Sequence, residues 1–385
     1  MRLLVDATPM ALQGYSKAGA YRYCLELLRH LPAELPEDWS LGLAFHFFRA
    51  HHLPRMREAV ELTGVADHVL SRWHPKLVRA LGVRAERVWG DHDLVHGPFD
   101  RVPPTRRAAR VVTVHDLAFL RSPEGLPAAW VAELSATVPP AVRRAHRVIT
   151  VSEFSRRDLV ERLGADPERT HAILHGISPA MRPPRDREAD LARLRERYGV
   201  EDGYLLQLGT LQPNKNVEGL CAAYQQLRAE GFPGQLVLAG GQGWLFDEMW
   251  SRIVARGHDA GVLRTGYLDE EDVPRLYGCC RAFALVSRLE GFGIPVAEAM
   301  ACGAPVVAAD ACSLPEVAGG AALLVDPDDP DSIADGLRRA AADGPEREEL
   351  VARGLSRARA FTWQRSAAEH VAVYRAALEE AAADR

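Results

Sequence analysis

The sequence predicts an α/β protein built from two doubly wound domains, and three observations lead to this prediction. The chain has 385 residues, which is more than one ordinary hydrophobic core accommodates. Short apolar segments alternate with helical patterns, as they do in parallel sheets covered by helices on both faces. The alternation is interrupted once, by the proline- and charge-rich segment Ser178–Arg187, and then begins again.

This interruption sets the expected domain boundaries. We expect residues 1–180 to form an N-terminal Rossmann-like domain and residues 181–197 to form a linker. Residues 198–360 are expected to form a second Rossmann-like domain, and residues 361–385 a C-terminal helix that crosses back to the first. Because ligands of open α/β sheets bind beyond the carboxyl ends of the strands, polar residues that directly follow predicted strands are the candidates for a site.

The apolar segments place the strands, and the periodic segments between them place the helices. In the first domain, strands are expected at Leu3–Val5, Leu41–Phe47, Leu94–His96, Val111–Val114 and Val148–Val151. In the second domain, they are expected at Tyr204–Leu208, Gln235–Ala239, Val262–Thr265, Ala282–Val286, Pro305–Ala308 and Ala322–Val325. Helices are expected at Ala20–Leu31, Trp130–Ala145, Glu153–Leu163, Glu188–Arg197, Val217–Glu230, Pro295–Ala301 and Trp363–Ala383.

Composition restricts the class of protein. Apolar residues make up 47% and charged residues 26%, and the formal net charge is −5, a globular balance that offers no overall attraction to nucleic acid. We expect a cytoplasmic protein, because the N-terminus does not resemble a signal peptide and no apolar run approaches 18 residues. Local arginine clusters fit either solvated helix faces or a surface for an anionic acceptor or a membrane edge. They are Arg106, Arg107 and Arg110; Arg143, Arg144 and Arg147; and Arg156 and Arg157.

The most informative segment runs from Ser287 to Gly303 and follows a predicted strand. Gly291 and Gly293 allow the backbone to approach a ligand closely, and Pro295 suits the first turn of a helix. The helix N-terminus and the loop N–H groups together would attract a diphosphate. Carboxylates can accept paired hydrogen bonds from sugar or ribose hydroxyls, which suits Glu290 and Glu298. Taken alone, Glu298 would more often be a solvated helix acid.

A second segment, from Leu206 to Asn216, combines a strand, a turn at Gly209 and a helix start. Only three of the 47 basic residues are lysines, so a lysine in this loop suggests a site that needs a compact ammonium group. We interpret Lys215 as a clamp that neutralises a leaving diphosphate. The alternative is a surface lysine without a function.

Two positions in the first domain are weaker candidates for site residues. His115 directly follows the strand Val111–Val114 and precedes Asp116, although a single histidine is usually structural. Gly19 lies in a loop that follows the first strand and opens a helix. The segment Ala239–Gly243 hints at a dinucleotide-binding loop, but Phe246 occupies the position of the third glycine.

Together these segments resemble glycosyltransferase family 4, whose members are retaining enzymes of the GT-B fold. Glu290–Gly303 is similar to the E-x7-E signature of that family, and Gly209–Asn216 is similar to its G-T-x-x-P-[RN]-K-N loop. Thr113–Leu117 resembles its histidine–aspartate segment. The similarity extends over nearly the whole chain. Further matches lie at Val151–Leu159, Gly266–Tyr277, Ser313–Ala318 and Phe361–Trp363.

The resemblance implies a retaining hexosyltransferase, mannosyltransferase-like, that needs no metal or other cofactor and uses a nucleoside diphosphate sugar as donor. It implies that Glu290, Lys215 and His115 carry the chemistry. Donor-binding positions follow from the same resemblance. They are Gly19, Gly209, Thr210, Asn214, Lys215, Gly266, Tyr267, Leu268, Glu290, Gly291, Phe292, Gly293, Ile294 and Glu298, of which Glu298 would hold the ribose and Gly266–Leu268 would lie near the base.

Some positions depart from the pattern of the family and leave the substrates open. Tyr21 stands where many relatives have a second glycine, His175 stands where an asparagine is usual, and Asn214 stands where a basic residue is frequent. The acceptor is therefore unidentified and would be a polysaccharide, glycolipid or small natural product, with peripheral membrane contact in the glycolipid case. The oligomeric state is also open. An epimerase-like or phosphorylase-like enzyme on the same fold, or a catalytically degenerate sugar-nucleotide-binding protein, are the competing interpretations.

Overall fold

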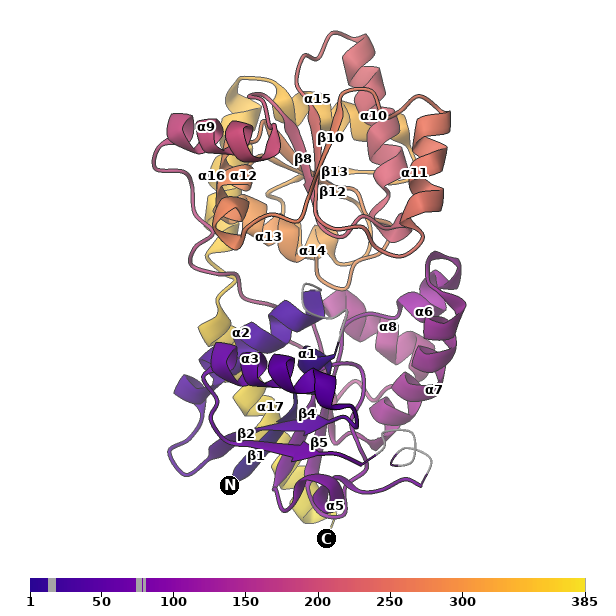
Figure 1. Cartoon of the computed structure of the whole chain (residues 1–385), viewed down its shortest axis with the longest axis vertical. Coiled ribbons are helices and arrows are strands. Elements are labelled where there is room, and N and C mark those ends of the chain that lie inside the picture. Colours follow the sequence, from indigo (N-terminus) through magenta and orange to yellow (C-terminus); the bar gives the residue numbers. More distant parts are fainter. Residues whose placement is uncertain (13–18, 74–77, 79–80, 385) are drawn as a thin grey trace. The chain divides into compact units, whose positions relative to one another are not determined.

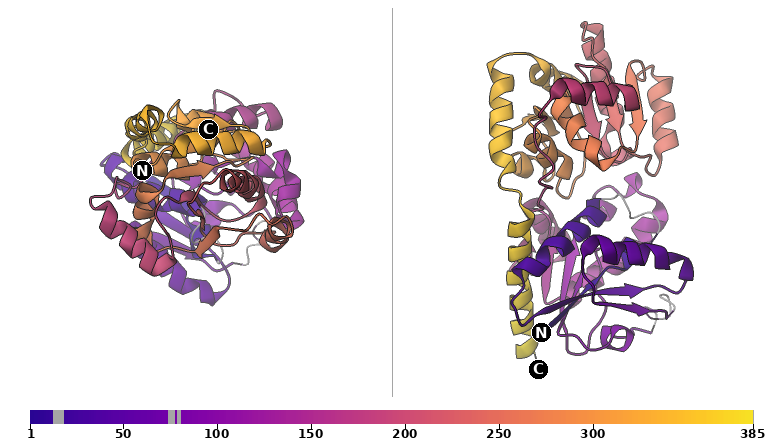
Figure 2. Two further views of the ribbon diagram at one scale, coloured as in Figure 1. Left: turned by 90° about the horizontal axis from the view of Figure 1, so that it is seen from above. Right: turned by 60° about the vertical axis from the view of Figure 1, so that its left-hand side comes forward.

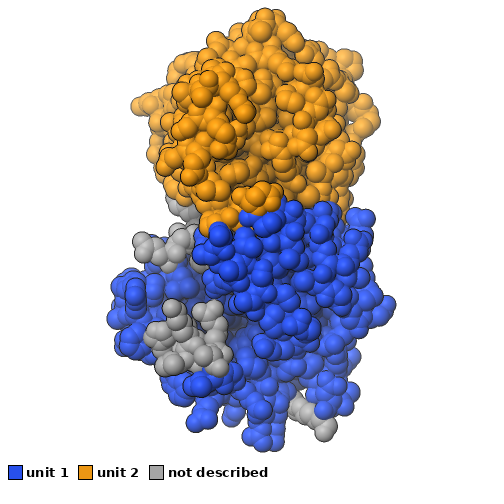
Figure 3. Space-filling view, turned by 90° about the vertical axis from the view of Figure 1, so that its right-hand side faces the viewer, with its two compact units in different colours: residues 1–123, 128–176, 362–385 blue, residues 124–127, 177–361 orange. Residues whose placement is uncertain are grey.

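The computed structural model of the chain describes residues 1–12, 19–73, 78 and 81–384 (Figure 1). The chain divides into two compact units, which Figure 3 shows in different colours. Unit 1 comprises residues 1–123, 128–176 and 362–385, and unit 2 comprises residues 124–127 and 177–361. The loop that precedes Gly19 lies outside the described residues.

Within its described residues, unit 1 contains a seven-stranded sheet with the order β3-β2-β1-β4-β5-β6-β7, in which neighbouring strands are parallel. The strand order reverses between β1 and β4, which creates a switch point where ligands of such sheets bind. The strands are β1 (Arg2–Asp6), β2 (Ser40–His46), β3 (His68–Ser71), β4 (Leu94–Gly97), β5 (Ala109–Val114), β6 (Arg147–Thr150) and β7 (Thr170–Ala172).

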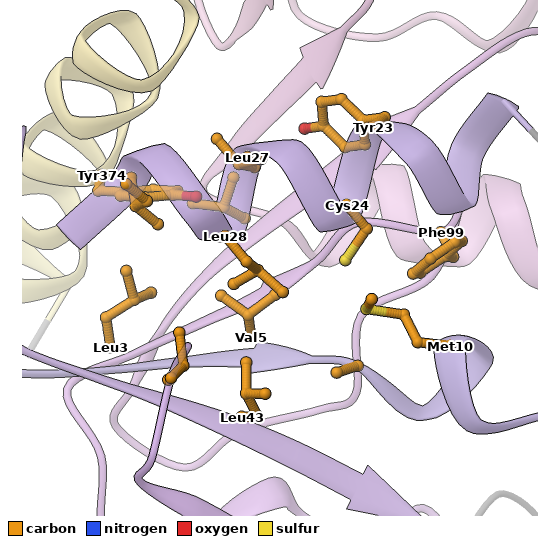
Figure 4. Packing of buried hydrophobic residues seen from close by; sticks show 14 of the residues in the cluster. Leu3, Val5, Met10, Tyr23, Cys24, Leu27, Leu28, Leu43, Phe99 and Tyr374 are labelled. Atoms are coloured by element: carbon orange, nitrogen blue, oxygen red, sulfur yellow. The ribbon is translucent and has the colours of Figure 1, made fainter. Parts of the chain in front are cut away.

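Helices pack on both faces of this sheet, and α2 shows why its sequence forms a helix there. Cys24, Leu27, Leu28 and Leu31 recur at helical spacing and are completely buried. Figure 4 shows Cys24 and Leu28 facing the strand residues Val5 and Leu43. The helices of this unit are α1 (Thr8–Ala11), α2 (Gly19–Glu34), η1 (Ala50–His52), α3 (Leu53–Thr63), α5 (Ala85–Trp89), α6 (Ala118–Arg121), α7 (Ala128–Arg144), α8 (Glu153–Leu163) and α17 (Trp363–Ala383).

The long C-terminal helix α17 is part of unit 1, where it packs on α2, β5 and β6 (Figure 2, right). Its N-cap is Thr362, whose hydroxyl accepts a hydrogen bond from the Arg365 N–H. The backbone approaches Gly176 so closely here that a Cβ on this glycine would lie 2.3 Å from the Trp363 nitrogen. Near the other end of α17, Glu380 forms ion pairs with Arg147 and Arg169.

Unit 2 repeats the same architecture with a six-stranded parallel sheet of order β10-β9-β8-β11-β12-β13 among the residues described. Its strands are β8 (Leu205–Leu208), β9 (Leu236–Ala239), β10 (Val262–Gly266), β11 (Ala282–Leu285), β12 (Val306–Ala309) and β13 (Leu323–Val325). Its helices are α9 (Arg187–Tyr198), η3 (Pro213–Lys215), α10 (Val217–Ala229), α11 (Phe246–Ala255), η4 (Glu270–Asp272), α12 (Val273–Cys279), α13 (Ile294–Ala301), α14 (Leu314–Ala318), α15 (Pro330–Ala341) and α16 (Pro345–Ala358).

One expected boundary is wrong: residues 181–197 are not a linker but part of unit 2. Helix α9 packs against α12, and the buried carboxylate of Asp272 accepts hydrogen bonds from Arg193, Arg197 and Tyr198. The charged residues that suggested a linker thus form an ion-pair cluster with Asp272. The expected strands also omitted β3 and β7, which are short and only partly apolar, as befits strands at the two edges of the sheet.

Candidate active site

The loop between β11 and α13 is shaped for a close ligand approach. Gly293 has φ +94° and is the N-cap of α13, and a Cβ at this position would lie 2.5 Å from a methyl carbon of Leu314. Only glycine suits both the left-handed backbone and that contact. The helix then begins at Ile294 and Pro295, where proline loses no intrahelical hydrogen bond. The Val296 N–H donates to the Gly293 carbonyl at 2.9 Å, while the Ile294 N–H at the start of the helix has no helical acceptor and suits an anion.

Glu290 in this loop is held by two donors on one carboxylate oxygen. Its Oε1 lies 2.7 Å from Ser287 Oγ and 2.5 Å from Lys215 Nζ, and the residue is 9% exposed. The backbone of the loop is fixed separately, because the Ser313 hydroxyl donates to the carbonyl oxygens of Glu290 and Phe292, 3.0 Å from each. The structure thus brings the two sequence motifs into direct contact through an ion pair.

The loop after β8 reaches this position through specific backbone conformations. Lys215 closes the short helix η3, and Asn216 follows it with φ +54°, a left-handed conformation that asparagine tolerates better than most residues. Asn214 joins the two loops, since its carbonyl oxygen accepts a hydrogen bond from the Arg288 N–H at 2.9 Å. Gly209, with φ +146°, turns the chain at the end of β8.

Glu298 is not the solvated acid that the residue alone would suggest. It lies on α13, is 2% exposed, and accepts a hydrogen bond from the Tyr277 hydroxyl at 3.1 Å. A carboxylate loses much solvation on burial, so its position next to the Glu290 loop favours a binding role over a surface role.

The end of β10 and the loop after β9 form the neighbouring part of the site. The Gly240 N–H donates to the carbonyl of Gly266, and the aromatic ring of Tyr267 packs so close to Gly241 that a Cβ there would lie 2.2 Å from it. Tyr267 itself is 58% exposed. A cavity of about 730 Å³ is lined by Leu211, Gly240, Gly241, Gln242, Val262, Arg264, Gly266 and Tyr267. The segment Ala239–Gly243, which does not match a dinucleotide-binding loop, therefore lines this cavity in part. The feature of the sequence that could have identified it is a pair of glycines directly after a strand.

In unit 1, His115 follows β5 and is held from two sides. Its backbone N–H donates to Asp100 Oδ1 at 3.0 Å, and its ring Nε2 lies 2.8 Å from the carbonyl oxygen of Pro98. Burial raises the pKa of the Asp100 carboxyl. The neighbouring Asp116 accepts a hydrogen bond from the Ala118 N–H at 2.9 Å. Gly19 is the first residue of α2.

Two neighbours of His115 were not identified as site residues from the sequence. The edge of the Tyr23 ring contacts His115, with ring centroids 5.1 Å apart and planes at 85°. The His175 ring stacks near His115 at 6.4 Å, and burial lowers its pKa well below the usual range. Position 175 was noticed only as a departure from the family, and neither residue could be placed near His115 without the fold.

Unit 1 also contains a cavity of about 640 Å³ near the carboxyl ends of β1 and β2. Asp6 and His46 contribute from the strand ends, Trp89 provides an aromatic wall, and Arg101 lies one residue beyond Asp100. This cavity combines a largely apolar lining with a few polar groups, as ligand pockets commonly do. The predicted site residues accordingly fall into two groups, with Gly19 and His115 in unit 1 and the remainder in unit 2.

Among the described residues, one group of carboxylates has the spacing of a metal site, formed by Asp269, Glu271 and Asp272. Arginine side chains pair with all three carboxylates, and Asp272 is completely buried beneath them. The arrangement is that of an ion-pair cluster that attaches α9. In the sequence it lies apart from the Glu290 loop.

Comparison with known proteins agrees with this geometry. Residues 192–357 match the family model "Glycosyl transferases group 1", and residues 18–180 match "Glycosyltransferase Family 4". The chain is 32% identical over 389 residues to O-antigen chain mannosyltransferase B of Escherichia coli, an alignment that covers 97% of this chain and 100% of that protein.

Solved structures resemble the fold at lower sequence identity. HepE of Anabaena, solved with UDP and glucose, has a TM-score of 0.72 at 20% identity, covering 97% of this chain and 98% of that one. Sucrose-phosphate synthase of Thermosynechococcus elongatus has a TM-score of 0.73 at 20% identity, with the same coverage. Both similarities concern the fold alone, two domains that are each built on a parallel sheet.

Proposed function

The chain belongs to the group 1 glycosyltransferases, family 4, and we propose that it transfers a hexose with retained anomeric configuration from a nucleoside diphosphate sugar to an acceptor hydroxyl. The observation that carries the proposal is the contact between Lys215 and Glu290, made within unit 2 beside the N-terminus of α13. A cation, a carboxylate and the N-terminus of a helix therefore lie at one edge of one sheet. A sugar diphosphate needs those three kinds of group.

The residues of unit 2 suggest how the donor is held. The diphosphate would take the ammonium of Lys215 and the N–H groups of Gly293 and Ile294, and Glu290 would accept hydrogen bonds from the sugar hydroxyls. Glu298, buried on α13, would bind the ribose hydroxyls. The base would lie against the wall formed by Gly266–Leu268, where Tyr267 exposes an aromatic ring.

Transfer with retention requires that the new bond forms on the face from which the diphosphate leaves. The acceptor oxygen forms a bond to the anomeric carbon as the bond from that carbon to the phosphate oxygen breaks. The acceptor proton passes to the leaving phosphate, and the products are the glycoside and the nucleoside diphosphate. In this proposal Lys215 stabilises the charge that develops on the phosphate, His115 lines the reacting centre, and no metal is needed.

Mannose is the first sugar to test, because full-length similarity connects this chain to an O-antigen mannosyltransferase. We propose the 640 Å³ cavity of unit 1 for the acceptor, since its aromatic and polar lining suits a saccharide attached to an apolar group. Arg101→Ala is then expected to raise the KM for the acceptor while leaving that for the donor unchanged. An unchanged KM for the acceptor would remove this cavity from the proposal.

The test of the donor uses calorimetric and thermal-shift titrations with GDP, UDP, dTDP, ADP and their sugar conjugates, each with EDTA and then with magnesium. A ligand that binds the folded state raises its apparent stability, so one nucleotide should give a shift that the others do not. The one-bond C1–H1 coupling of the first glycoside product reports its anomeric configuration. Binding of no nucleotide, a strict magnesium requirement, or an inverted product would each refute the corresponding part of the proposal.

Peripheral contact with the inner face of a membrane is a further part of the proposal. Among the described residues no helix is both long and apolar enough to cross a bilayer. Arg143 and Arg144 are exposed at the end of α7, whereas Arg147 of the same cluster pairs with Glu380 and cannot serve this purpose freely. Flotation with anionic liposomes should therefore be weakened by the double variant Arg143→Ala, Arg144→Ala. Equal capture of variant and wild type would exclude this surface.

A further inference from the structure

A continuous chain of hydrogen bonds runs through the interior of unit 1, and both of its ends lie on α17. It begins at the Tyr374 hydroxyl, which lies 2.9 Å from His96 Nδ1 on β4. It ends at His370, whose Nδ1 lies 2.6 Å from the carbonyl oxygen of Ser366, one turn earlier on the same helix. Tyr374, His96 and His370 have no exposed surface. Figure 4 shows the positions of Tyr374 on α17 and Tyr23 on α2.

Two residues connect these ends through the sheet. Thr113 on β5 lies 2.8 Å from His96 Nε2 and 2.9 Å from the Tyr23 hydroxyl, both measured from its Oγ1. The Tyr23 hydroxyl lies 2.7 Å from His370 Nε2. Five hydrogen bonds thus link α17, β4, β5 and α2 in one sequence of contacts.

The carbonyl oxygen at one end determines the direction of every bond in the chain. A carbonyl only accepts, so His370 carries its proton on Nδ1. Burial lowers the pKa of His370 to about 4 and that of His96 well below the usual range, so both rings are neutral at pH 7. The Nε2 of His370 must then accept from the Tyr23 hydroxyl.

The same reasoning continues from Tyr23 to the other end. Because Tyr23 donates to His370, its oxygen accepts from Thr113, and the Thr113 oxygen in turn accepts from His96 Nε2–H. The Nδ1 of His96 is therefore the acceptor for Tyr374. All the donors point the same way, from Tyr374 to Ser366, and each ring has one defined tautomer.

This chain adjoins His115 through the ring of Tyr23. The His115 ring meets the edge of Tyr23, and its Nε2–H donates to the Pro98 carbonyl, because a carbonyl only accepts. His175 contacts Tyr23 in the same edge-on manner, with ring centroids 5.0 Å apart. Tyr23 is thus the residue that both belongs to the chain of hydrogen bonds and touches the candidate reaction centre.

We propose that Tyr23 and His370 are positioning residues for sugar transfer, and that the chain of hydrogen bonds anchored on α17 keeps the Tyr23 ring against His115 in one orientation. The inference rests on the role of His115 in the proposed function. The C-terminal helix α17 then has two roles. It completes the hydrophobic core of unit 1, and it sets the orientation of a side chain at the reaction centre. Neither residue contacts the substrates in this account.

The variant Tyr23→Phe tests this inference because it retains the ring and removes only the hydroxyl. Its kcat should fall roughly tenfold, equivalent to about 1.4 kcal/mol in the barrier, while the KM for the donor stays within twofold. The matched control is Tyr224→Phe in unit 2, whose buried hydroxyl donates to the Gly234 carbonyl at 2.8 Å. The control should lose comparable stability without a change in kcat. Equal kcat losses in the two variants, or a kcat for Tyr23→Phe within twofold of wild type, would overturn the inference.

Nuclear magnetic resonance of ¹⁵N-labelled histidine tests the same coupling without any substrate. In the wild type, His370 should show the Nδ1–H tautomer and His96 the Nε2–H tautomer. Tyr23→Phe should move the ring signals of His370 and of His115, whereas Tyr374→Phe, at the far end, should move chiefly those of His96.

A His115 signal that is unchanged in Tyr23→Phe would overturn the inference even if nucleotide binding and transfer are as proposed. Conversely, a protein that binds no nucleotide but shows the coupled signals would refute only the proposed function. If Tyr23→Phe does not fold, His370→Gln provides the same readout at His115.

Discussion

The two units contain opposite kinds of candidate site. The unit 2 site consists of consecutive loop residues next to strand ends, and its main contact is one ion pair between Lys215 and Glu290. The surroundings of His115 in unit 1 come from β4, β5, α2, α17 and the segment at His175, and are buried aromatic and imidazole rings. Charged side chains dominate the candidate site of unit 2, whereas buried, neutral rings surround His115 in unit 1.

This difference also appears in how each unit should respond to acid. Unit 2 contains one of the 14 histidines of the chain, His258. In unit 1, burial lowers the pKa of several histidines. These rings therefore stay neutral at pH values where a histidine exposed to water is already protonated. They are His52, His92, His96, His146, His171, His175 and His370.

The largest expected effect concerns the charge in unit 2. Lys215→Ala should lower kcat by about 100- to 1000-fold, the range measured when one group that stabilises developing negative charge is removed. Ser287→Ala is the control, because it removes the other hydrogen bond to Glu290 Oε1 and leaves the lysine in place. Steady-state kinetics of both variants separate the two roles. Equal losses would mean that Lys215 acts only by holding Glu290.

The sequence singles out the unit 2 candidates because their signal is local. Gly293, Glu290 and Lys215 lie in segments where strand, glycine turn and helix start follow one another, and that order itself places them at a sheet edge. Tyr23 and His370 gave no such signal, since 347 positions separate them and only packing brings them to 2.7 Å. A buried tyrosine and histidine in amphipathic helices are indistinguishable from ordinary core residues by sequence pattern.

The fold shows the same division between local and non-local information. The alternation of strands and helices predicted both sheets, but the short, partly polar edge strand His68–Ser71 lacked the apolar run that identifies its neighbours. The charged helix Arg187–Tyr198 was predicted, yet its membership of unit 2 depends on the buried carboxylate of Asp272. Such a partner is visible only in three dimensions.

Acidification should destabilise unit 1 selectively. The folded pKa of His370, about 4, is below its unfolded value of 6.5, so its contribution to stability is complete above pH 6.5 and is lost as the pH falls toward 4. The loss amounts to about 3 kcal/mol for this residue, at 1.36 kcal/mol per pKa unit. His96 and His175 shift in the same direction and add to it.

Differential scanning calorimetry between pH 7.5 and 4.5 checks this expectation. The transition assigned to unit 1 should move to lower temperature below pH 6.5, and the transition of unit 2 should move less. His370→Gln should reduce the pH dependence, whereas His68→Gln, at an exposed position on β3, should leave it unchanged. Equal acid sensitivity of the two transitions would contradict the contrast between the units.

A smaller effect, on the free energy of unfolding, is expected where Gly176 packs against the start of α17. Gly176→Ala would place a methyl group 2.3 Å from the Trp363 nitrogen, so α17 must shift and the free energy of unfolding should fall by about 1–3 kcal/mol. Thr362→Ala removes only the N-cap of α17 and should cost about 1 kcal/mol. Urea unfolding compares the two variants. A cost for Gly176→Ala no greater than that of Thr362→Ala would show that the close approach is easily relaxed.

If unit 2 binds the donor and unit 1 governs transfer, calorimetric titration of the nucleoside diphosphate into two variants should separate the two tasks. Glu298→Ala should weaken binding by roughly 10- to 100-fold, as expected for the loss of hydrogen bonds to a charged group. His115→Ala should bind the nucleotide within twofold of wild type and yet abolish transfer. Normal transfer by His115→Ala, or unchanged nucleotide affinity in Glu298→Ala, would contradict this division of tasks.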